Sequence, residues 1–289
     1  MVLELDDGTT ITDLSRPRQG MRHRVLFGVD ASSGREVAAK IELLPGALET
    51  ERRALEWLGA HDGPSPRLHA AGTVISSEDR GAVCLVSDRV DGENPRSLAG
   101  WDRLGRALAR LAQLPWQGSG LDIQDHQAFL AVHERRLDDL GRALGSDLRE
   151  RLPPVHPSYP DSPLIVTHGD PGPGNFLDDG ATGTLIDWED AQVAPRGLDL
   201  GRAAFIALVG SGPEGYAAED QAARARAVIA GFLAESGDWT PDADELAWWL
   251  GVAGVQFAHR RLERAGEPGV LPWLDAVAVL EGALAGQCA

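Results

Sequence analysis

Residues 164–190 hold the side chains best suited to chemistry, in the order LIVTHGDPGPGNFLDDGATGTLIDWED. One apolar run leads into Asp170, a loop of Pro and Gly continues to Asn175, and a second apolar run leads into Asp187, with Glu189 close behind. Two strands ending in this way bring these oxygen-bearing side chains together. Mg²⁺ requires such oxygens on rigid backbone, and phosphoryl transfer needs a carboxylate that orients the attacking hydroxyl. A surface loop rich in Asp and Asn is the alternative, but it does not explain an Asp at each strand end.

Lys40 is the only lysine of the chain. It lies in Val37-Ala-Ala-Lys40, where alternation predicts a strand, and Glu51 lies in the helical pattern that follows. A strand lysine paired with a helix glutamate can hold its ammonium over the α and β phosphates of a nucleotide. An exposed strand lysine is commoner in general, and Glu49 is a second possible partner. We predict that Lys40 and Glu51 bind nucleotide.

Composition restricts the classes of function. The chain has 289 residues, 43% of them hydrophobic, and a formal net charge of −17. This charge argues against nucleic-acid binding, which requires clustered Lys and Arg. The sequence shows no membrane-spanning run and no signal peptide, and Cys84 and Cys288 indicate neither a disulfide framework nor a metal site. We therefore expect a cytoplasmic protein with no membrane partner, whose oligomeric state the sequence leaves open.

The order of the expected elements divides the chain in two. Residues 1–91 are predicted to be rich in β structure, with strands at 22–29, 36–43 and 82–90 and a helix at 47–60. In the first strand, Val25, Phe27 and Val29 form the apolar face. Residues 92–289 are predicted to be mainly helical, with helices near 98–111, 137–152, 217–236, 241–265 and 270–285.

The helix at 241–265 is expected to begin with Thr240 as N-cap and Pro241 at its first position. Together these elements predict an α+β fold of two lobes. The smaller, residues 1–91, would bind nucleotide, and the larger, residues 92–289, would hold the catalytic and substrate-binding residues.

The motifs VAAK, E-x-x-x-L-x-W-L, HGDPGPGN and IDWED occur in this order. In this respect the chain resembles the aminoglycoside phosphotransferase and choline kinase-like family, from about Lys40 to Leu200. The resemblance implies the bilobal protein-kinase-like fold of that family and ATP or GTP as cosubstrate with Mg²⁺. The sequence departs from protein kinases in having no GxGxxG motif over the phosphates, and residues 15–20 are only a candidate for the nucleotide loop.

The resemblance also implies a role for particular residues. Asp170 would be the catalytic base or would position the hydroxyl, Asn175 and Asp187 would hold Mg²⁺, and Lys40 would bind the nucleotide phosphates. Whether Glu189 contacts the metal stays open. The remaining implied roles are loop support by His168 and Asp199, and nucleotide contacts through the segment containing Asp88 and Val90.

The acceptor pocket is expected to use acidic residues, because carboxylates pair with ammonium groups. An indole can also stack against a cation or a sugar; the candidates are Trp239, Trp248 and Trp249. These features favour a small cationic substrate, an aminoglycoside or basic peptide antibiotic, and hence antibiotic resistance. The candidate substrate-binding acids are Glu189, Asp190, Asp238, Asp242 and Glu245.

Three other functions compete with this hypothesis. The first is a kinase of a small metabolite, such as an amino sugar or amino alcohol. The second is a nucleotide-binding pseudokinase, which is disfavoured because Lys40, Asp170, Asn175 and Asp187 are all present. The third is a metal-dependent hydrolase, which the lack of clustered histidines disfavours.

Overall fold

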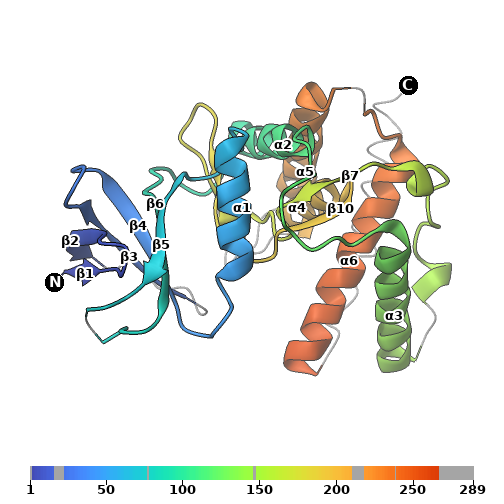
Figure 1. Ribbon diagram of the computed structural model, residues 1–289. Coiled ribbons are helices and arrows are strands. Elements are labelled where there is room, and N and C mark those ends of the chain that lie inside the picture. The colour runs from blue at the N-terminus through green and yellow to red at the C-terminus, as the bar shows by residue number, and fades with distance from the viewer. Residues whose placement is uncertain are drawn as a thin grey trace.

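The protein has an antiparallel sheet near its N-terminus and a group of helices beyond it, with helix α1 between them (Figure 1). This computed structural model describes residues 2–15, 23–76, 78–145, 148–209, 218–237 and 239–266. The predicted α+β class with a small β-rich lobe and a larger helical lobe is confirmed. The expected lobe boundary after residue 91 falls between strand β6 and helix α2 and remains a prediction.

The N-terminal sheet has the strand order β1-β2-β3-β4-β6-β5. Its buried face includes Leu26, Val37 and Ile41. Val25 and Phe27 share the predicted apolar face of β3; this face lines a cavity, and Leu26 on the opposite face belongs to the core. Alternation located the strand but could not tell its core face from its cavity face. The strands are Leu3–Glu4 (β1), Thr10–Ser15 (β2), His23–Asp30 (β3), Glu36–Glu42 (β4), Leu68–Thr73 (β5) and Val83–Asp88 (β6).

Helix α1, Glu49–Ala60, connects the sheet to the helical lobe. Its residues Leu55 and Leu58 belong to the same hydrophobic core as helices α2, α4 and α5. Glu51, one turn earlier on this helix, is only 6% exposed. A buried carboxylate requires a partner, so α1 must lie next to a positive charge.

The helical lobe consists of α2 (Leu98–Ala112), α3 (His126–Leu144), α4 (Leu198–Val209), α5 (Ala218–Glu235) and α6 (Ala243–Ala265). Two expectations about helix ends were wrong. The helix predicted to reach residue 152 ends at Leu144, because Gly145 takes a left-handed conformation with φ of 64°. Helix α6 is capped by Asp242 and not by Thr240. The helix expected at 270–285 lies outside the described residues.

Short strands in this lobe form two small antiparallel pairs. Strand β7, Leu164–Thr167, pairs with β10, Gln192–Pro195. Strand β8, Phe176–Leu177, pairs with β9, Thr184–Leu185. No helix in the described ranges is both long and apolar enough to cross a membrane.

Helices α2 and α5 approach closely through glycine. A Cβ on Gly105 of α2 would overlap the carbonyl oxygen of Val228, and one on Gly231 of α5 would overlap that of Asp102. No side chain therefore fits at either point without moving a helix, and these glycines set the interhelical distance. Gly59 of α1 is different, because a Cβ there would meet nothing within 4 Å.

We expect Gly105→Ala and Gly231→Ala each to lower the free energy of unfolding by about 1–3 kcal/mol, since the added methyl group overpacks the helix contact. Gly59→Ala is the matched control and should raise stability slightly, because alanine favours a helix more than glycine does. Denaturant titration of the three variants measures the difference. Equal stabilities would contradict the role assigned to the two buried glycines.

Candidate active site

A cavity of about 780 Å³ lies between the sheet and the helical lobe. Val25 and Phe27 provide an apolar wall on the sheet side, and Asp170 lies on the opposite side. The cavity brings together most of the residues predicted from sequence to bind nucleotide, metal or substrate: Lys40, Glu51, Asp88, Val90, Asp170, Asn175, Asp187, Glu189 and Asp190.

Lys40 connects three parts of the chain. It extends from β4 toward the cavity, and its ammonium contacts Glu51 of α1 and, at 2.5 Å, the Oδ1 of Asp187. Burial alone would lower the pKa of Lys40, but the two carboxylates outweigh it and raise the pKa. The ammonium therefore stays charged at neutral pH, as a group that binds phosphate must.

Backbone constraints shape the loop that holds Asp170. After β7 the chain turns at Gly169, whose φ is +83°. The buried carboxylate of Asp199 accepts hydrogen bonds from the backbone N–H groups of His168 at 2.5 Å and Gly169 at 3.1 Å. The His168 ring lies 2.9 Å from the carbonyl oxygen of Ile186, and burial lowers its pKa, so the ring is neutral and donates to that oxygen. These contacts give His168 and Asp199 the positions expected of supporting residues.

The two asparagines of the chain both hold this loop. The Asn175 amide nitrogen donates to the backbone oxygen of Asp170 at 2.9 Å, and the Asn94 amide nitrogen donates to that of Pro173 at 2.7 Å. The backbone N–H of Ile186 donates to the carbonyl oxygen of Asn175 at 2.9 Å. The loop that follows Asp170 and the strand end that precedes Asp187 are thereby tied together.

The donor set on these segments fits Mg²⁺. Because the Asn175 nitrogen is used by the loop, its Oδ1 is the atom that would hold a metal, together with the carboxylate of Asp187. Both are hard oxygen ligands of the kind Mg²⁺ prefers. Asp187 has a φ of 67°, an unusual backbone conformation for a residue other than glycine. Such conformations cluster at functional sites.

Glu189 lies in a second group of possible ligands. Its Oε2 is 2.5 Å from the Nε2 of His23, and one donor atom each from His23, Asp187 and Glu189 lie within 4.8 Å of one another. His23 was not predicted from the sequence. It stands at the start of β3, and nothing in its local pattern marks it as a site residue.

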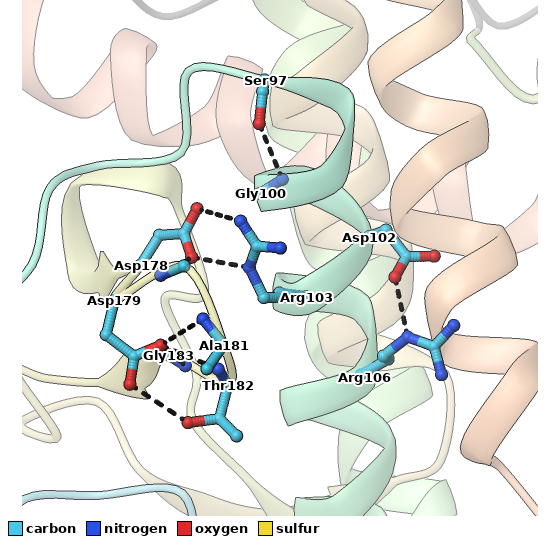
Figure 2. Close-up of polar contacts among 11 residues, drawn as sticks. Ser97, Gly100, Asp102, Arg103, Arg106, Asp178, Asp179, Ala181, Thr182 and Gly183 are labelled. Carbon is cyan, nitrogen blue, oxygen red and sulfur yellow. Dashed lines mark hydrogen bonds and ion pairs between the residues drawn. The ribbon is translucent and has the colours of Figure 1, made fainter.

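The β8–β9 turn is anchored to helix α2, as Figure 2 shows. Arg103 makes two hydrogen bonds to Asp178, of 2.6 and 2.8 Å, and this contact lowers the pKa of Asp178. Asp179 accepts hydrogen bonds from three backbone N–H groups of the turn, those of residues 181–183. The turn connects Asn175 to Asp187, so this anchoring fixes the spacing of the two proposed metal ligands.

A family comparison agrees with this geometry. Residues 13–267 match the model of the APH group, described as the phosphotransferase enzyme family. The chain belongs to this phosphotransferase family. A sequence search of curated proteins finds no match.

Solved structures show the same fold. One is a candidate aminoglycoside phosphotransferase from Ralstonia eutropha, 17% identical over 93% of this chain and 89% of that one, with a TM-score of 0.62. Another is a choline/ethanolamine kinase family protein from Mesorhizobium loti, 18% identical over 94% and 87%, with a TM-score of 0.56. A third is amicoumacin kinase hAmiN in complex with AMP-PNP, Ca²⁺ and Ami, 12% identical over 95% and 88%, with a TM-score of 0.58. The kinase-like fold expected from the resemblance is therefore confirmed.

Sequence reasoning missed the arginines of this phosphotransferase site. Arg260 of α6 lies 3.6 Å from the Oδ1 of Asp170 and 3.3 Å from the Oδ2 of Asp190. It follows Asp170 by 90 positions in the sequence, and only the packing of α6 brings it there. Glu263 and Arg264, one turn further along, also line the cavity.

Two of the acids expected to bind substrate lie elsewhere in the phosphotransferase. Asp242 and Glu245 are at the N-terminal end of α6, roughly 22 to 27 Å along the helix from Arg260 at 1.5 Å per residue. Asp242 caps the helix by accepting from the Glu245 N–H at 2.8 Å. Glu245 is 6% exposed. Neither residue lines the cavity, and Asp238 lies outside the described residues.

The three tryptophans predicted to stack on the substrate pack against other residues of the protein. Trp248 and Trp249 are 2% and 1% exposed and pack with Phe129 in a core cluster. The ring of Trp239 faces the guanidinium of Arg196, 5.6 Å from the ring centroid. The hypothesis that Trp248 and Trp249 stack on the substrate was wrong, because both lie in a stretch of α6, residues 245–256, in which every residue is buried.

We expect Gly169→Ala to destabilise the protein by about 1–3 kcal/mol and to reduce phosphotransfer, because residue 169 has positive φ and a Cβ there would overlap the carbonyl oxygen of Asp190. Gly172→Ala in the same loop is the matched control, since its φ is −75° and its Cβ would lie 3.5 Å from Ile206. Thermal unfolding and turnover measure the contrast. Similar losses in both variants would refute it.

Proposed function

We propose that this phosphotransferase moves the γ-phosphate of ATP or GTP to a hydroxyl group of a small molecule. The observation that carries the proposal is the contact of Lys40 with both Glu51 and Asp187, in the cavity that also holds Asp170 and Asn175. A lysine that a helix glutamate holds beside a carboxylate metal ligand is an arrangement that binds the phosphates of a nucleoside triphosphate. Such a reaction draws on cytoplasmic nucleotide, so the proposal places the protein in the cytoplasm.

In this proposal each residue has one task. Lys40 binds the nucleotide phosphates, and the apolar side chains of Val25 and Phe27 lie where the nucleobase would pack. Asn175 and Asp187 hold Mg²⁺, which neutralises phosphate oxygens when bound. Asp170 orients the acceptor hydroxyl and accepts its proton while the new O–P bond forms and the bond to the β-phosphate oxygen breaks.

For the acceptor, we propose a molecule with at least one ammonium group. The support is the set of acids that line the cavity beside Asp170, namely Glu189, Asp190 and Glu263. The structural relatives include an aminoglycoside phosphotransferase candidate and a kinase of amicoumacin, which favours a cationic antibiotic. The choline/ethanolamine kinase relative supports the alternative, an amino alcohol or amino sugar.

The test of the proposal is nucleoside diphosphate release with ATP or GTP and Mg²⁺, against a panel of cationic antibiotics, amino sugars and amino alcohols. We expect Asp170→Asn to lower turnover by about 10²–10⁴-fold, because a positioned acid–base group contributes that much. Nucleotide affinity should change little. Asp138→Asn, an aspartate on α3 whose side chain is 60% exposed, is the control.

The acceptor that supports turnover would decide between the antibiotic and the metabolite. Turnover of Asp170→Asn at the wild-type rate would refute the role of Asp170. Tight nucleotide binding without transfer to any acceptor would favour the pseudokinase. Hydrolysis that needs metal but no nucleotide would favour the hydrolase.

A separate variant tests the metal ligand. Asp187→Asn should weaken the binding of Mg²⁺–AMP-PNP by at least about tenfold, because it removes a charged oxygen ligand. In EDTA the variant should bind AMP-PNP no less tightly than the wild type, since the lost carboxylate competes with phosphate for Lys40 when no metal is present. Calorimetric titration measures both affinities, and an unchanged affinity with Mg²⁺ would exclude Asp187 as a ligand.

A further inference from the structure

The guanidinium of Arg260 lies between two carboxylates of the cavity. Its Nη1 is 3.6 Å from the Oδ1 of Asp170, and its Nη2 donates a hydrogen bond to the Oδ2 of Asp190 at 3.3 Å. The other carboxylate oxygen of Asp170 faces Asn175, whose amide nitrogen is 3.4 Å away. The Oδ1 of Asp170 is therefore the oxygen better placed for an acceptor hydroxyl, and the arginine covers it.

The arginine is held loosely in this position. Asp170, Arg260 and Asp190 are each about two fifths exposed, and both contacts are longer than the roughly 2.7–2.9 Å of a strong charge-assisted hydrogen bond. A permanent contact of this fold looks different, since Arg103 binds Asp178 through two hydrogen bonds of 2.6 and 2.8 Å. Exposed ion pairs contribute little to stability, so the guanidinium of Arg260 can leave its carboxylates at a small cost in free energy.

A second carboxylate stands ready for the displaced arginine. Glu263 follows Arg260 by three positions on α6, and residues at this spacing lie on the same face of a helix. Glu263 also lines the cavity, and its carboxylate is 64% exposed and 3.6 Å from the ring of His259. A rotation of the arginine side chain alone would bring its guanidinium toward Glu263, and the release of Asp170 needs no movement of α6.

We propose that Arg260 occupies the acceptor's place between Asp170 and Asp190 and leaves it when the acceptor binds. This inference rests on the proposed function. The acceptor hydroxyl replaces Nη1 at Asp170, and the acceptor ammonium replaces Nη2 at Asp190. One cation is thereby exchanged for another, and the two carboxylates keep a positive partner throughout.

This exchange makes Arg260 a residue that determines specificity. A neutral or acidic acceptor would displace the arginine without supplying a new cation to Asp190, and an ammonium group supplies one. The two outer nitrogens of a guanidinium are bonded to one carbon, so the groups that replace them lie close together. The favoured acceptor carries its hydroxyl and its ammonium on neighbouring carbons.

Two compounds isolate the ammonium group. 2-Aminoethanol carries a hydroxyl and an ammonium on neighbouring carbons, and ethane-1,2-diol carries hydroxyls alone. Each is titrated into protein saturated with Mg²⁺ and AMP-PNP, and binding is followed by saturation-transfer NMR. We expect Arg260→Gln to bind 2-aminoethanol at least about threefold more tightly than the wild type, because the competing exposed cation is gone. The affinity for ethane-1,2-diol should change little.

Arg261→Gln is the matched control. It removes the same charge from the next position of α6, where the side chain is exposed and does not line the cavity, and it should bind 2-aminoethanol as the wild type does. Adding Asp190→Asn to Arg260→Gln should abolish the gain, since the ammonium loses its carboxylate. Binding that is no tighter in Arg260→Gln than in the wild type, or an equal gain in Arg261→Gln, would overturn the inference.

Turnover separates an exchangeable arginine from a fixed one. If Arg260 leaves during each cycle, Arg260→Gln lowers KM for an ammonium-bearing acceptor and keeps kcat. A lower kcat at unchanged KM would mean that Arg260 holds Asp170 in place throughout, which overturns the inference while the proposed function stands. Tighter 2-aminoethanol binding by Arg260→Gln without transfer to any acceptor would count against the proposed function instead.

Discussion

The ammonium of Lys40 is the contact on which the rest of the site depends. It lies in a partly enclosed position, 15% exposed, and a charge there requires opposite charges. Glu51 supplies one from α1, and Asp187 supplies the other from the loop after β9. Because α1 packs into the core of the helical lobe, the same contact sets the position of the sheet relative to that lobe.

A second set of constraints acts on the backbone and not on the reacting side chains. The loop from His168 to Asn175 has little regular structure, so its polar backbone groups need other partners. Asp199 and Asn94 provide them, and Arg103 anchors the turn that follows. The loop is thereby held from α4, from the segment before α2 and from α2 itself. Asp170 can stay in place although no helix or strand contains it.

The site residues that the sequence predicted lie close to one another along the chain. Asp170, Asn175 and Asp187 follow one another within two strands and a loop, and local pattern therefore placed them together. Arg260 could not be found in this way, because its place depends on how α6 packs. Asp242 and Glu245 were wrongly expected in the substrate pocket for a related reason. Acidic residues are favoured at helix N-termini as well as at sites for cationic substrates, so their presence alone does not separate the two. The sheet illustrates the same limit, since alternation located β3 without telling its core face from its cavity face.

The net charge of −17 therefore indicates substrate specificity less well than the few charged side chains that line the cavity. Many of the acids are engaged within the fold, as Asp178 is with Arg103 and Asp242 is with the end of α6. Around Asp170 the balance differs, because Arg260 of α6 contacts both Asp170 and Asp190. An acceptor that enters this cavity meets both signs of charge within a few ångströms. Recognition there depends on these local charges, and the overall field of the protein does not decide it.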